Sequence, residues 1–180
     1  LVPKRIDLLS DMLPQAKTFA LMMNPRNSNA DRMVGYALEA AQAKRLRFET
    51  VKASTDAELD AAFEALRQIR ADGLVVGADS FLYTHAAQIG ALCVRHSLAA
   101  SAESRQFAVA GGLMSYGTDY AAVYEQVGAY TGRILHGEKP TDLPVQQPAK
   151  FELVINLEAA KALGLTVPPF LLARADDVIE

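Results

Sequence analysis

The sequence has 180 residues and a formal net charge of −3, from 18 Lys and Arg against 21 Asp and Glu, and this length suits one domain or a compact pair. Because there is no basic excess and no Lys/Arg cluster, counterion release gives little drive for binding nucleic acid or an anionic membrane, and we expect neither partner. Hydrophobic residues make up 51%, which indicates a globular chain, while one cysteine and three scattered histidines predict no internal disulfide, no metal site and no cofactor.

Strands and helices alternate along the first hundred residues, after a short amphipathic helix at 4–13. Short apolar runs predict strands at 17–23, 47–53, 73–78 and, more weakly, 98–101. Apolar residues at helical spacing predict helices over 29–45, from Leu59 to Ile69, and after Ser80. Thr55 and Glu58 fit a capping box, and Ser80 is the expected N-cap of the third helix. The alternation predicts an α/β fold of three layers, a parallel sheet with helices on both faces.

The pattern changes after residue 110. The segment AGGLMSYG has paired glycines and a short apolar strand, and a helix follows from Asp119 to His136, where Gly137 ends it. One face of this helix is apolar, with Val123, Val127, Tyr130 and Ile134. The proline-bearing stretch 138–149 predicts an extended connector, which leads to a strand at FELVIN and a helix at 157–163 capped by Asn156 and Gly164.

Ligands bind open parallel sheets at the carboxyl ends of the strands, so the candidate site residues are the polar and aromatic ones found there. They are Asn24, Asn27, Ser28 and Asn29 after the first strand, Asp79, Ser80 and Phe81 after the third, Ser101 and Glu103 after the fourth, and Tyr116 beside the glycines. Each has an alternative, purely structural role. Asn24 and Asn29 either cap and close a turn or contact ligand, Asp79 either complements a helix N-terminus or contacts ligand, and Tyr116 either packs or faces a cleft.

No catalytic constellation is found. The first strand–helix turn, NPRNSN, lacks the glycines of a dinucleotide site, and neither GxxxxGK[ST] nor a GxSxG elbow occurs. Asp79 resembles a phospho-acceptor at a strand end, but Asn24 stands where the magnesium-binding acidic pair of a receiver domain would lie. We therefore predict no catalytic residues and no enzyme activity.

Several segments resemble the ABC-transporter substrate-binding family of the tryptophan/tyrosine type. They are Lys4-Arg5, MNP, AGGLMSYG, ILHGEKPTDLPVQQPAKFELVINLEAAKALGLTVPP and LLARADDVIE. The resemblance runs nearly end to end, and it implies a type I periplasmic-binding-protein fold, in which two α/β lobes hold a small molecule and close by a hinge motion. It further implies an importer component that delivers its solute to an ABC permease, in a periplasmic or extracytoplasmic location. An amino acid is the expected ligand class, because Asp79 or Glu103 could pair with its ammonium group.

Members of this family carry another lobe and an export signal before the point that corresponds to Leu1, so we expect the chain to be a fragment or a processed product. Residues 1–112 and 141–180 would then form the second lobe, and 113–140 would cross to the first. The apolar helix face would lose its cover, which predicts a homodimer through 113–137. The alternative function is a ligand-sensing input domain of a signalling or transcription regulator with the same fold.

Overall fold

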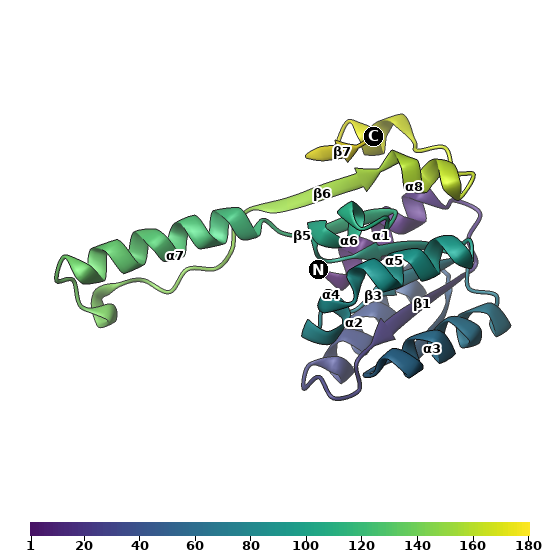
Figure 1. Cartoon of the computed structure of the whole chain (residues 1–180), viewed down its shortest axis with the longest axis horizontal. Coiled ribbons are helices and arrows are strands. Elements are labelled where there is room, and N and C mark those ends of the chain that lie inside the picture. The colour runs from purple at the N-terminus through teal and green to yellow at the C-terminus, as the bar shows by residue number, and fades with distance from the viewer.

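A computed structural model describes residues 1–180 and shows one twisted sheet between two layers of helices, with an arm that extends away from it (Figure 1). The sheet has seven strands in the order β2-β1-β3-β4-β5-β6-β7. The strands are β1 (Thr18–Met23), β2 (Arg47–Lys52), β3 (Gly73–Val76), β4 (Ala99–Ala102), β5 (Met114–Thr118), β6 (Phe151–Asn156) and β7 (Asp177–Ile179). The expected α/β fold with helices on both faces is confirmed.

Each face of the sheet has its own hydrophobic core. Alternation along β1 divides the side chains, with Phe19 and Leu21 on one face and Ala20 and Met22 on the other. The first face is covered by α1 (Val2–Met12), α2 (Ala30–Ala43), α8 (Leu157–Ala162) and α9 (Pro169–Leu172). The second face is covered by α3 (Asp56–Gln68), α4 (Ser80–Thr84), α5 (Ala86–Arg95) and α6 (Arg105–Val109). Strands buried on both sides explain the nearly continuous apolar runs in the sequence.

One strand departs from the parallel arrangement. Strands β1 to β5 pair in parallel, but β6 runs antiparallel to β5, with Thr118 opposite Phe151 and Met114 opposite Ile155. Strand β7 is again parallel to β6. The sheet is therefore mostly parallel, because the chain leaves it through β5 and returns beside the same strand through β6.

The arm consists of α7 (Tyr120–Leu135), the short 3-10 helix η1 (Pro140–Asp142) and the extended return to β6 (Figure 1). None of the residues of α7 is buried, although Val123 and Tyr130 are half-covered. The hydroxyl of Tyr130 donates a hydrogen bond to the carbonyl of Pro144 (2.7 Å), which holds the return segment against the helix. The base of the arm is closed by the amide of Asp119, which donates to the carbonyl of Lys150 (3.1 Å).

Most of the expected helix ends are confirmed, and one is wrong. Thr55 caps α3 by accepting from the amide of Glu58, and Asn156 caps α8. The expected N-cap Ser80 is instead the first residue of α4, whose cap is the carboxylate of Asp79, an acceptor for two amides. The carboxylate of Asp79 also carries a full negative charge toward the helix dipole, which a serine hydroxyl would not. None of the helices is long and apolar enough to cross a bilayer.

Asn156 joins two layers of the fold, and its replacement tests this. Its Oδ1 accepts from the amide of Ala159 (2.8 Å), and its Nδ2 donates to the carbonyl of Ala108 (2.9 Å). We expect Asn156→Ala to lower the free energy of unfolding by about 2 kcal/mol, because it removes a cap and one of the two hydrogen bonds that the Ala108 carbonyl accepts, the other coming from the amide of Gly111. Urea unfolding followed by circular dichroism measures the change. Thr55→Ala, which removes an exposed cap alone, is the control and should lose less; an equal loss would contradict the second role of Asn156.

Candidate functional site

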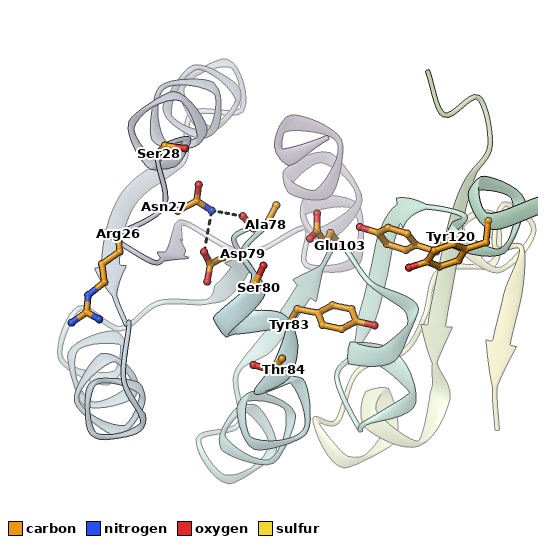
Figure 2. Close-up of a pocket in the computed structure, with 11 residues that line it drawn as sticks. Arg26, Asn27, Ser28, Ala78, Asp79, Ser80, Tyr83, Thr84, Glu103 and Tyr120 are labelled. Carbon is orange, nitrogen blue, oxygen red and sulfur yellow. Dashed lines mark hydrogen bonds between the residues drawn. The ribbon is translucent and has the colours of Figure 1, made fainter. Parts of the chain in front are cut away.

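A cleft opens at the carboxyl ends of β1, β3 and β4. The connections after β1 and β3 leave toward opposite faces of the sheet, through α2 and α4, so the two loops diverge and leave a crevice between them. The cleft has a volume of about 780 Å³, within the range of small-molecule sites. Its lining residues are Arg26, Asn27, Ser28, Ala78, Asp79, Ser80, Tyr83, Thr84, Glu103, Tyr120 and Tyr124 (Figure 2).

The carboxylate of Asp79 ties the two diverging loops together. One oxygen accepts from Nδ2 of Asn24 (3.0 Å) and from the amides of Phe81 and Leu82 at the start of α4. The other oxygen accepts from Nδ2 of Asn27 (3.0 Å), as the dashed line in Figure 2 shows. Both oxygens of Asp79 are thus occupied by donors of the protein itself, and this carboxylate fixes the floor of the cleft.

The two asparagines of the first loop also shape their own turn. The amide of Arg26 donates to Oδ1 of Asn24, and the amide of Asn29 donates to Oδ1 of Asn27, both at 2.9 Å. These are Asx turns, the local bonds that favour asparagine in such positions. The Asn27 side chain donates in addition to the carbonyl of Ala78 (2.9 Å), so it joins the first loop to the second at two points.

Glu103 supplies a second carboxylate of a different kind. It follows β4, is half-buried in the cleft wall and forms no hydrogen bond with the other cleft residues drawn in Figure 2. Its backbone lies against Gly117 of β5, where an added Cβ would come within 1.8 Å of the Glu103 carbonyl oxygen. Only glycine therefore permits this approach, and it sets the position of the Glu103 side chain.

Three tyrosines flank Glu103. Tyr83 comes from α4, while Tyr120 and Tyr124 stand one turn apart at the start of α7. Partial burial raises the pKa of Tyr120, and the negative charge of Glu103 raises it further. Arg26 lies at the opposite end of the cleft from Tyr83 and Tyr120 (Figure 2). The cleft thus has a cationic end and an aromatic end with a carboxylate.

The structure brings five of the ten candidate site residues to the cleft, namely Asn27, Ser28, Asp79, Ser80 and Glu103. Asn24 lies behind it and positions Asp79. The other four lie elsewhere: Asn29 accepts from Nη2 of Arg32, Phe81 stacks on His85, Ser101 is fully buried in β4, and Tyr116 stacks on Phe151. Whether any of the ten contacts a ligand stays a prediction.

Sequence reasoning missed the residues that reach the cleft from elsewhere, among them Arg26, Tyr83, Tyr120 and Tyr124. The spacing of Tyr120 and Tyr124 at the start of the helix after 118 was the available signal, since i and i+4 share a helix face. No group of three His, Cys, Asp or Glu side chains is placed to hold a metal ion. Cys93 is buried, and burial raises the pKa of its thiol.

Comparison with known proteins gives consistent results. Residues 1–179 match the family described as ABC transporter substrate binding protein. The curated tyrosine-binding protein of Clostridioides difficile (strain R20291) is 24% identical over 166 residues, which are 91% of this chain and 47% of that protein. The match confirms the resemblance read from the sequence. Because the family binds substrates without catalysis, it also confirms the expectation that the chain is not an enzyme.

Two solved structures share the fold closely. A conserved domain protein from Vibrio cholerae superposes with a TM-score of 0.87 at 25% identity, over 98% of this chain and 60% of the other. A Streptococcus pneumoniae ABC domain in complex with L-Trp gives a TM-score of 0.87 at 22% identity, over 99% and 60%. The chain therefore spans about half to three-fifths of the length of these relatives.

The contact between Gly117 and Glu103 can be tested by adding one methyl group. We expect Gly117→Ala to lower the free energy of unfolding by about 3 kcal/mol, because the new Cβ meets backbone that cannot yield without moving β5 or the loop after β4. Gly128→Ala in α7 is the matched control, since its Cβ would meet nothing within 4 Å and should be neutral or stabilising. Urea unfolding gives both values. A neutral Gly117→Ala would contradict the close approach.

Proposed function

Because the chain belongs to the family of ABC transporter substrate-binding proteins, we propose that it is the solute-binding part of an ABC importer that captures an aromatic amino acid and delivers it to a membrane permease. The observation that carries the choice of ligand is the Glu103 carboxylate, which no other cleft residue in Figure 2 hydrogen-bonds and which shares the cleft with three tyrosines. The names of a tyrosine-binding relative and of a relative in complex with L-Trp support the same class. An extracytoplasmic location, general in this family, is part of the proposal.

The polarity of the cleft suggests an orientation for the ligand. The ammonium group pairs with Glu103 rather than with Asp79, because both oxygens of Asp79 already accept hydrogen bonds from the chain. The aromatic ring packs among Tyr83, Tyr120 and Tyr124, and the carboxylate points toward the end that holds Arg26. This arrangement satisfies both charges of a zwitterion with groups that are present in the cleft.

The cleft described here would be one wall of a two-lobed site. We expect residues 1–112 and 141–180 to belong to one lobe and 113–140 to the crossing segment, with a second lobe supplied by sequence that the relatives have beyond the matched region. Strand β5 is paired within this sheet, so the part that leaves it is the arm, 119–150. A helix without a buried residue supports such a partner lobe, and closure of the lobes would remove water from the ligand.

The rival function, a ligand-sensing input domain of a signalling or transcription regulator, shares the fold. The family match over residues 1–179 supports transport instead. The two functions predict different segments elsewhere in the gene. A secretion leader or lipid anchor would support the importer, and a DNA-binding or kinase segment would support the sensor.

The exposed side of α7 leads to a prediction about association. Val127 is 55% exposed and Ile134 41% exposed, so the 180-residue chain by itself is expected to form a homodimer through 113–137. Light scattering measures the mass. Val127→Lys together with Ile134→Lys should return it to a monomer, whereas Lys at Ala43 and at Glu64, far from the arm, should not. A monomeric unmodified chain would contradict the prediction.

Ligand binding tests the proposed function itself. With one wall of the cleft, the 180-residue chain is expected to bind L-tryptophan weakly, with a Kd in the millimolar range or above, in an NMR titration of its amide signals. Glu103→Gln should weaken binding roughly tenfold or more by removing a charge-assisted hydrogen bond. The same substitution at the exposed Glu64 is the control. Submicromolar binding by calorimetry would contradict the division into lobes, and unchanged binding in Glu103→Gln would contradict the role of Glu103.

A further inference from the structure

Arg5 is a buried cation that the proposed function leaves unexplained. It lies on α1, which packs against β3, β4 and β5, and its side chain is only 1% exposed. Its neighbours along the buried side of α1 are apolar, among them Val2, Ile6 and Leu9. Arginine is almost never buried to this extent without a partner, so its surroundings need an account.

No carboxylate forms an ion pair with Arg5. Nη1 donates a long hydrogen bond to the carbonyl of Val76 (3.3 Å), and Nε is buried with no partner at all. Burial lowers the pKa of Arg5 to about 10, and the charge of Glu103 opposes that shift, so the guanidinium is still charged at neutral pH. A buried charge paired this poorly destabilises a fold, and an apolar side chain of similar size would fill the space better. Stability does not explain Arg5.

The position of Arg5 relates it to the cleft. Val76 is the last residue of β3, and Gly77 alone separates it from Ala78 and Asp79 in the cleft. Glu103, whose negative charge raises the pKa of Arg5, lies in the wall of the same cleft. The guanidinium therefore sits beneath the ends of the strands that carry the binding loops. Because the guanidinium itself is buried, its field is screened less than that of a surface charge and reaches the cleft without contact.

We propose that Arg5 determines specificity by its charge, so that the cleft takes a zwitterionic amino acid and discriminates against the amine that lacks the carboxylate. The inference rests on the proposed function. Glu103 alone would attract any ammonium group. The positive charge of Arg5 repels the ammonium group and so weakens that attraction. A ligand that also has a carboxylate compensates, because Arg5 attracts the carboxylate. Arg5 acts through space as a positioning charge and does not touch the ligand.

The experiment compares L-tryptophan with tryptamine, which lacks the carboxylate, by NMR titration of the 180-residue chain. The readout is the ratio of the two Kd values. A substitution that merely loosens the cleft raises both Kd values alike and leaves their ratio unchanged. Arg5→Met is expected to lower the preference for L-tryptophan by about tenfold, the effect of one unit charge at several ångströms in a partly buried site. Arg5→Lys keeps the charge and should keep most of the preference. Lys4→Met, which removes a charge from the adjacent, partly exposed position of α1, should leave it unchanged.

Thermal unfolding provides a second measurement that needs no ligand. The proposal expects the Tm of Arg5→Met to equal or exceed that of the unchanged chain, whereas Ile6→Ala, beside it in the core, should lower the Tm by several degrees. A fall for Arg5→Met as large as for Ile6→Ala would overturn the proposal, because Arg5 would then be structural. An unchanged ratio of Kd values would overturn it too. If the unchanged chain binds neither compound, the proposed ligand class is wrong. The Tm comparison then still tests whether Arg5 is a structural residue.

Discussion

Four hydrogen bonds to the carboxylate of Asp79 determine the form of the cleft. At a point where neighbouring strands send their connections to opposite faces, nothing in the sheet itself holds the two loops in register. Asp79 does so, because it accepts from Asn24 and Asn27 of the first loop and from the amides of Phe81 and Leu82 in the first turn of α4. The side chains of Ser80, Tyr83 and Thr84 depend on the direction in which α4 starts, and that direction follows from this one group.

The two carboxylates of the cleft show how the same chemical group serves two purposes. Asp79 is saturated by internal donors and acts as part of the scaffold, while Glu103 is held in place by its backbone against Gly117 and half-buried in the cleft wall. Arg5, beneath the same strands, is in contrast a buried charge whose Nε has no hydrogen-bond partner. Features that lower stability, such as an unpaired buried charge, gather at functional sites in proteins.

The fold followed from the sequence because its signals are local. Apolar runs and helical spacing identified the strands β1 to β4 and the helices between them, and a strand-end rule then located the cleft. The contents of the cleft were harder to predict. Ser101 is fully buried within β4, and Tyr116 lies in the middle of β5 stacked on Phe151, so neither side chain lines the cleft as that of Glu103 does. Tyr120 and Tyr124 reach the cleft from another part of the chain, and only the tertiary fold places them there.

The arm leaves and returns through paired strands whose ends meet, with Thr118 opposite Phe151 and the amide of Asp119 bonded to the carbonyl of Lys150. The pairing of β5 with β6 therefore holds the two ends of the stretch 119–150 together, whatever that stretch contains. Insertions, deletions or complete replacement of that stretch would leave the seven strands and their two cores intact. An exchange of this element would replace the cleft side chains of Tyr120 and Tyr124 and leave those that follow β1, β3 and β4 unchanged.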